Sequence, residues 1–379
     1  MSILLRHIIG AVSALLLATA ASAQVGVSPT QIVIGQTLTL QNGQNAYGVD
    51  VTEGVQAALD RVNRSGGVFG RRISVKLLDD NNQAAQAEAN ARSLINLDKV
   101  FLVFGSIEGG PSMAVLKATT ELGTPFFAPM AGSPGLRTPH QPLVFPVRAE
   151  HKAEFRALMA HARSLGMTRV AFFRSDSETG QQHLANVQRL AQELNLELVA
   201  DLAFKSDIDA AGISAMAAQL ANSKAQMVFN HGGIGTYEKL IRRSRETGGR
   251  TQFYAVNSGS TQLAQSLGPL AHGMIFAQVL PSPWERKTEA SRAYQEAYTR
   301  FKPGKGFSYG SFEGYLSAMA LVEALRRAGP QPTRDSFVAG LRNVVLDVHG
   351  LQISFRNGDH AGLPLVDLAI YTRDGRFMH

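Results

Sequence analysis

Cysteine is missing from all 379 residues of the chain. Its absence excludes disulfide bonds, thiol catalysis, cysteine-ligated metals and lipid attachment through an N-terminal cysteine. The ten histidines form no H-x-x-x-H pair and no tight cluster with acidic residues along the sequence, so we expect no metal site. Residues 105–110 also depart from the G-x-G-x-x-G fingerprint of dinucleotide-binding proteins. The sequence therefore predicts no cofactor.

Long apolar runs are missing everywhere except at the N-terminus. There, Arg6 precedes an apolar run from Ile8 to Ala18, and the small residues Ala21-Ser22-Ala23 precede Gln24. This pattern is typical of a cleavable secretory signal peptide over residues 1–23, because the run is shorter than the roughly 20 residues of a spanning helix. No later stretch has 18 uninterrupted apolar residues. We expect an exported protein, free in the periplasm without a lipid anchor.

The charge balance does not identify a partner by itself. The formal net charge is +7, but lysine and arginine are dispersed, with short pairs such as Arg242-Arg243 and Arg326-Arg327. A solvated basic surface explains this distribution, and long-range attraction of an anionic ligand is the alternative. Export and the lack of a binding motif argue against a nucleic-acid partner.

The clearest pattern lies in residues 47–80. Apolar residues at helical spacing (Val51, Val55, Ala58, Leu59, Val62) predict an amphipathic helix. The glycine pair Gly66-Gly67 predicts its end, because glycine enters the left-handed conformation that closes a last turn. Residues 72–77 then alternate like a strand.

The alternation of helices and strands continues along most of the chain. Apolar strands are expected at 100–104, 124–128, 169–173, 197–199, 226–229 and 252–256, with amphipathic helices between them. Uninterrupted apolar strands between helices predict parallel sheets covered on both faces. The length and the restart of the pattern near Pro142 predict an α/β fold of two doubly wound parallel-sheet lobes.

These residues resemble the type I periplasmic solute-binding proteins of ABC importers, the branched-chain amino-acid-binding family. The resemblance covers the mature chain and rests mainly on an ordered series: Tyr47-Gly48, Gly54, Ala57-Ala58, Asn63, Gly66-Gly67, Gly70-Arg71 and Asp79-Asp80. It implies a ligand cleft between two lobes joined by a three-strand hinge. The expected lobes are 24–147 with 279–350, and 148–278 with 351–379. Hinge motion is expected near residues 147–148, 279–283 and 350.

Ligands of open parallel sheets bind beyond the carboxyl ends of the strands. This rule and the family resemblance predict the same loops. The candidate ligand-binding residues are Tyr47, Ser106, Glu108, Gly109, Gly110, Ala131, Gly132, Ser133, Thr179, Asn230, His231, Gly232 and Asn257. The glycines are favoured because close backbone approach requires a missing side chain.

Departures from the family pattern bear on the ligand. The serine and threonine that hold the ligand carboxylate in amino-acid binders align with Gly109 and Gly132, and the acid that pairs with the ammonium aligns with Asn257. An uncharged amide cannot supply that ion pair. Glu108 is a candidate replacement acid, and Arg148 or Arg174 a candidate partner for an acidic ligand. An organic or aromatic acid is therefore preferred over a standard branched-chain amino acid, with an amino-acid or amide ligand as the alternative.

Two other functions compete with transport. Residues 306–310 match the G-x-S-x-G elbow of serine hydrolases, yet residues 300–305 are polar and proline-broken where the elbow needs a buried strand. We expect no enzyme, and we place Ser308 in the loop that enters the following helix. A ligand sensor for a membrane receptor is the second alternative. The family resemblance favours a monomer that captures a small molecule and docks on permease subunits of the inner membrane.

Overall fold

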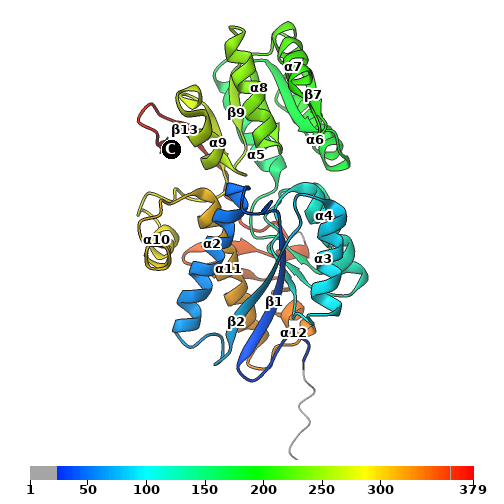
Figure 1. Ribbon diagram of the computed structural model, residues 1–379, viewed down its shortest axis with the longest axis vertical. Helices are drawn as coiled ribbons and strands as arrows, with labels where there is room; N and C mark the ends of the chain where they lie inside the picture. Colours follow the sequence, from blue (N-terminus) through cyan, green and yellow to red (C-terminus); the bar gives the residue numbers. More distant parts are fainter. Residues whose placement is uncertain (1–23, 359) are drawn as a thin grey trace, which may run out of the picture.

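The computed structural model describes residues 24–358 and 360–379 of the chain. The predicted signal peptide lies outside the described residues. Figure 1 shows two lobes arranged along the long axis of the molecule, with the blue, cyan and orange segments in one and the green segments in the other. The chain thus has the α/β architecture of two sheet-based lobes that the sequence predicts.

The first lobe is built on a five-stranded parallel sheet with the order β2-β1-β3-β4-β5. Its strands are β1 (Gln31–Leu38), β2 (Arg72–Asp79), β3 (Val103–Phe104), β4 (Phe126–Phe127) and β5 (Val144–Phe145). Its helices are α2 (Ala46–Arg64), α3 (Ala84–Asn96), α4 (Gly109–Glu121), α10 (Glu289–Phe301), α11 (Tyr309–Ala328) and α12 (Arg334–Leu341). Each strand runs from the base of the lobe toward the second lobe, so the loops after the strands face the space between them (Figure 1).

Two glycines bring α11 directly against α2. A Cβ atom on Gly54 would lie 1.8 Å from the backbone oxygen of Ser311, and one on Gly314 would lie 2.1 Å from that of Val51. Any larger residue would force the helices apart. This close contact fixes the start of α2 beside the start of α11.

The second lobe is built on a seven-stranded sheet with the order β14-β13-β10-β9-β8-β6-β7. Its strands are β6 (Arg169–Ser175), β7 (Glu197–Phe204), β8 (Met227–His231), β9 (Gln252–Ala255), β10 (Ile275–Gln278), β13 (Asp367–Tyr371) and β14 (Phe377–Met378). Its helices are α5 (His151–Ser164), α6 (Glu178–Glu193), α7 (Ala210–Asn222), α8 (Ile234–Glu246) and α9 (Ser260–Leu267). The last two strands are antiparallel additions to a parallel core.

One expected crossing between the lobes is misplaced. Gly350 lies in the tight turn between β11 (Val345–Val348) and β12 (Leu351–Ser354), which pair with each other. After β12, Phe355 packs edge-to-face on Phe145 of the first lobe, with ring centroids 5.5 Å apart. The segment 351–355 therefore lies with the first lobe and not with the second. The chain crosses later, where the Leu363 amide donates to the Val147 carbonyl at 2.7 Å.

Candidate functional site

The loops that follow the strands of the two lobes meet each other across the interlobe space. A Cβ atom on Gly109, at the start of α4, would lie 3.0 Å from Thr179 Cγ2 in the second lobe and 3.1 Å from Ser133 Oγ in the first. The Asn257 side chain of the second lobe donates through Nδ2 to Glu313 Oε2 of α11, in the first lobe, at 3.0 Å, and the Asn257 backbone amide donates to Glu154 Oε2 at 2.6 Å. These contacts bring the predicted residues Gly109, Ser133, Thr179 and Asn257 to the contact between the two lobes.

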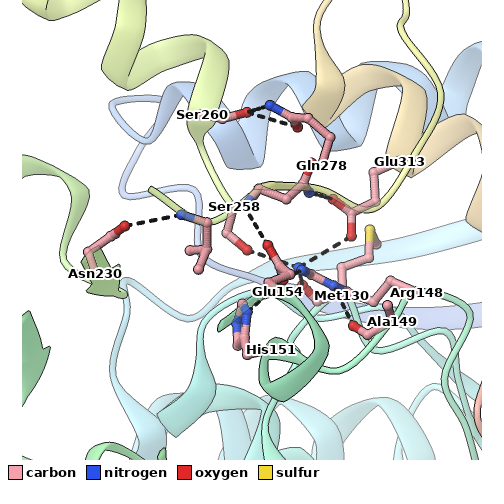
Figure 2. A network of polar contacts seen from close by, with 12 residues as sticks. Met130, Arg148, Ala149, His151, Glu154, Asn230, Ser258, Ser260, Gln278 and Glu313 are labelled. Atoms are coloured by element: carbon pink, nitrogen blue, oxygen red, sulfur yellow. Dashed lines mark hydrogen bonds and ion pairs between the residues drawn. The ribbon is translucent and has the colours of Figure 1, made fainter. Parts of the chain in front are cut away.

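A buried arginine lies at the centre of a network of polar contacts where the lobes meet (Figure 2). Arg148 is 2% exposed. Its guanidinium forms an ion pair with Glu154 and donates to Ser258 Oγ at 2.9 Å and to the Met130 carbonyl at 3.2 Å. His151 Nδ1 lies 2.8 Å from the same Glu154 carboxylate. The sequence suggested Arg148 as a candidate partner for an acidic ligand. In the structure its guanidinium is already bonded on several sides by the protein, so it is not free to take that role.

Sequence reasoning missed a second buried carboxylate, Glu313 on α11. Its Oε2 accepts a hydrogen bond from Tyr47 OH at 2.9 Å and one from Asn257 Nδ2 at 3.0 Å. Its Oε1 lies 3.6 Å from Arg148 Nη1 and has no hydrogen-bond partner within the described part of the chain, and the same holds for Asn257 Oδ1. The amide at Asn257 therefore does not leave the site without an acid. Its side chain hydrogen-bonds to Glu313, which the first lobe supplies. We call Tyr47, Arg148, Glu154, Asn257 and Glu313 the arginine network.

Burial and neighbouring charges act in opposite directions on the two carboxylates. Burial raises the pKa of Glu313, and the nearby Arg148 offsets this only in part. Burial would also raise the pKa of Glu154, but Arg148 and His151 more than compensate and the pKa is lowered. Glu154 is thus the main counter-ion of Arg148, whereas the negative charge of Glu313 is less well compensated.

Three imidazoles form a second cluster beside the arginine network. The ring centroid of His151 lies 5.4 Å from that of His183 and 5.3 Å from that of His231, and the last two centroids lie 4.0 Å apart. We call these three residues the histidine cluster. Burial lowers the pKa of all three, so they are neutral near pH 7. Both ring nitrogens of His183, Nδ1 of His231 and Oγ of the neighbouring Ser133 find no hydrogen-bond partner among the residues that the structure describes.

The histidine cluster is close in space although its members are far apart in sequence. The described residues nevertheless contain no group of histidine, cysteine or acidic side chains arranged to hold a metal ion. The chemistry on offer is a set of neutral nitrogens and a hydroxyl that can donate or accept hydrogen bonds.

Other predicted residues have internal roles. Ser106 Oγ pairs with Ser112 Oγ at 2.6 Å inside the first lobe. The Asn230 side chain accepts from the Val256 amide at 3.2 Å and so ties two strand ends together. Glu108 is half-buried and adopts a φ of +64° at the start of α4, and burial raises its pKa. Arg174 forms a bidentate ion pair with Asp201, from Nε to Oδ1 at 2.8 Å and from Nη2 to Oδ2 at 2.6 Å, so its guanidinium already has a partner.

The remaining glycine and alanine predictions concern backbone approach. A Cβ atom on Gly132 would meet His151, with its backbone nitrogen and Cγ both 2.6 Å away. Gly232 has a φ of +67°, and Ala131 is buried. Gly110 lies open, with nothing within 4 Å of an added Cβ. Gly132 therefore makes room for the histidine cluster, whereas Gly110 leaves the first turn of α4 accessible.

Ser308 does not have the surroundings of a nucleophile. Its Oγ accepts from the Ser311 amide at 3.1 Å and donates to Asp50 at 2.8 Å. This is the geometry of a helix N-cap. Ser308 caps α11, the helix that carries Glu313.

The amino-acid sequence of the chain matches a family of known proteins. The sequence model of the family described as "Periplasmic binding protein" matches residues 31–374. The chain belongs to the periplasmic binding protein family. Among its relatives is Leu/Ile/Val-binding protein homolog 7 of Brucella abortus, which is 23% identical to this binding protein over 331 residues, or 81% of this chain and 80% of the relative.

Solved structures agree with this assignment. An extracellular ligand-binding receptor from Verminephrobacter eiseniae superposes with a TM-score of 0.82 at 25% identity, covering 92% of this chain and 100% of the receptor. A solute-binding protein of an ABC transporter from R. palustris, in complex with benzoate, superposes with a TM-score of 0.80 at 16% identity, covering 92% and 95%. The second likeness concerns the fold alone.

The binding protein is thus an extracytoplasmic solute-binding protein of the leucine-binding family that serves ABC transporters. Members of the family bind small molecules, work with permease subunits and are not enzymes. Within the described residues, no helix is both long and apolar enough to cross a membrane.

Proposed function

We propose that this protein captures a small organic or aromatic acid that also carries an amine, amide or hydroxyl donor, and delivers it to an ABC permease. The observation that carries the proposal is the pair of buried acceptors, Glu313 Oε1 and Asn257 Oδ1, that lack a hydrogen-bond partner in the described structure. A buried acceptor without a partner is costly. A ligand donor placed between these two oxygens would remove that cost.

The start of α4, also at the contact between the lobes, suits a carboxylate. Helix α4 begins at Gly109 without a side-chain cap, and helix N-termini attract anions through their free amides and dipole. The Ser133 hydroxyl is buried beside Gly109 and has no hydrogen-bond partner among the described residues. A standard branched-chain amino acid is still not favoured, because Gly109 and Gly132 offer no side-chain hydroxyls. An amino acid remains the alternative, since Glu313 can provide the acid that Asn257 lacks.

A matched pair of ligands tests this proposal. We would titrate the purified protein with 4-aminobenzoate and with benzoate by calorimetry, and include leucine and an aliphatic amide. The amino compound is expected to bind at least about tenfold more tightly, because benzoate leaves both acceptors unpaired. Equal binding of the pair would refute the donor requirement, and tight leucine binding would support the amino-acid alternative.

A substitution on α11 locates the effect. Glu313→Gln is expected to weaken 4-aminobenzoate binding by roughly 10- to 100-fold, as for a hydrogen bond to a charged group. Glu323→Gln is the matched control on the same helix, since Glu323 pairs at the surface with Arg326 and Arg327. An equal loss in both variants would show that Glu313 does not contact the ligand.

Cellular context is part of the proposal. Residues 1–23 are proposed to direct export to the periplasm, where the closed, monomeric protein docks on its permease. Deletion of residues 1–23 should leave the protein in the cytoplasmic fraction. Co-purification of the ligand-loaded protein with a receptor kinase, and not with a permease, would favour the sensory alternative.

A further inference from the structure

A second cavity lies on the edge of the second lobe, beside the chain segment that leaves β10. It has a volume of about 420 Å³ and is lined chiefly by Ser282, Trp284, Tyr371, Arg376 and Phe377, with Gln265 at one side. We call it the crossover cavity. It shares no lining residue with the arginine network or the histidine cluster. Its volume is in the range that holds a small organic molecule.

Aromatic rings form its walls. The indole of Trp284 stacks on Phe377 with centroids 5.4 Å apart and an interplanar angle of 8°, and Tyr371 meets Phe377 at 5.1 Å. Trp284 remains 38% exposed, which is unusual for so large an apolar side chain. The rings offer an apolar surface on which a further ring can stack.

One polar group in the cavity has no partner. Ser282 is 6% exposed, and its Oγ makes no hydrogen bond within the described residues. It also lines an adjoining cavity of about 200 Å³ together with His379. A buried hydroxyl without a partner indicates that an occupant with one hydrogen-bonding group would be favoured there.

The charged groups at the rim already have partners. Arg376 pairs with Asp374 at 3.3 Å, and Glu285 pairs with Lys287 at 3.0 Å. Neither pair leaves an unpaired charge to select an ion. We propose that the crossover cavity is a second binding site, for a neutral molecule with one aromatic ring and one hydroxyl or amide group.

The site adjoins the contact between the lobes. Trp284 packs edge-on against Tyr309, with centroids 5.3 Å apart, and the Tyr309 amide donates to Thr261 Oγ1 of the second lobe at 3.3 Å. Tyr309 is the first residue of α11, one turn before Glu313. An occupant that stacks on Trp284 would therefore favour the closed arrangement, and the ligand of the cleft would in turn favour the occupant.

The single tryptophan of the chain makes a direct test possible. We would titrate the purified protein with benzyl alcohol while following Trp284 fluorescence, with toluene as the counterpart that lacks the hydroxyl group. A saturable change with benzyl alcohol, and a clearly weaker response to toluene, is expected. Quenching that rises linearly without saturation, or an equal response to toluene, would overturn the proposal.

Two variants assign the signal to the cavity. Ser282→Ala should weaken benzyl alcohol binding about fivefold through loss of one neutral hydrogen bond, whereas Ser266→Ala, on the exposed side of the adjacent α9, should not change it. Glu323→Gln, on the outer side of α11, should leave the fluorescence titration intact, because Glu323 pairs with Arg326 and Arg327 and does not line the cavity. An unchanged Ser282→Ala titration, or loss of the signal in Glu323→Gln, would show that the molecule binds elsewhere.

Discussion

The arginine network and the histidine cluster occupy neighbouring parts of one cleft but are satisfied very differently. Around Arg148 almost every polar atom has a partner from the protein, and the two lobes contribute jointly. Around His183 and His231 the rings are equally buried, yet several of their nitrogens have none in the described chain. The polar groups of the arginine network mainly hydrogen-bond to one another. The rings of the histidine cluster mainly pack against one another.

This difference separates stability from recognition. Removing one partner of a buried ion pair strongly destabilises a protein, because the other charge stays buried without compensation. Neutral imidazoles that lack partners contribute little electrostatic energy in the empty site, but they can each donate or accept toward a ligand. We therefore expect substitutions of Arg148 and Glu154 to act mainly on the fold, and those in the histidine cluster to act on pH dependence. Glu313 and Asn257 each keep one oxygen without a hydrogen-bond partner in the described chain, so substitutions there should act on binding.

The largest effect should follow from removing the arginine. Arg148→Met leaves the buried carboxylates of Glu154 and Glu313 without their cation and should lower the free energy of unfolding by about 3–5 kcal/mol. Chemical denaturation measures this change. Arg156→Met is the control, because Arg156 pairs with Glu193 at the surface and should cost less than about 1 kcal/mol. Similar losses in both variants would show that the arginine network stabilises the fold no more than a surface ion pair does.

A smaller effect is expected where the regions touch. Gly132→Ala would place a methyl group 2.6 Å from the His151 backbone nitrogen, so the loop must shift, at a cost of about 1–3 kcal/mol. Gly110→Ala adds the same methyl group in open space and should change stability by less than about 1 kcal/mol. Thermal unfolding of the two variants gives the comparison, and a tolerated Gly132→Ala would mean that the loop yields easily.

The histidine cluster predicts a sensitivity to acid. The folded-state pKa of each ring lies below its ordinary value of 6.5. As the pH falls through 6.5 the unfolded chain takes up protons that the folded chain does not, so the free energy of unfolding decreases until the folded pKa is reached. The limit is about 1.4 kcal/mol per pH unit for each histidine.

Denaturation curves at pH 7.5, 6.5 and 5.5 would measure this slope. His183→Gln should make the loss of stability on acidification smaller, and His272→Gln, at an exposed position, should not. If the slope were the same in all three proteins, His183 would not be a neutral buried group.

Local patterns in the sequence predicted the lobes well. The helix over α2 and the strand β2 follow from apolar spacing and turn glycines, which are local properties. The crossing near Gly350 was wrong because a glycine with positive φ serves a hairpin turn as well as it serves a hinge. The pairing of β11 with β12 and the packing of Phe355 on Phe145 distinguish the two cases.

The site was predicted less completely, because its chemistry joins distant segments. Tyr47 and Asn257 were proposed as separate site residues, and both hydrogen-bond to Glu313. Glu313 was overlooked because most other residues of α11 are apolar or small, so that the sequence of this helix resembles that of a core helix. His183 was likewise hidden in the pattern of α6. An acidic residue on the buried side of α11, four residues after Tyr309, was the signal that could have revealed Glu313.

The junction of α2 and α11 at Gly54 and Gly314 has a consequence for empty carriers. Because both helices belong to one lobe, a separation of the lobes would leave Tyr47 beside Glu313 and take Asn257 away with the other lobe, so that water would reach the carboxylate. Closing without cargo would strip that water from Glu313 Oε1 and leave it only the ion pair with Arg148 Nη1 at 3.6 Å, with no hydrogen bond in the described chain, a cost of about 1–3 kcal/mol. An importer that responds to the closed form would then seldom hydrolyse ATP for an unloaded carrier.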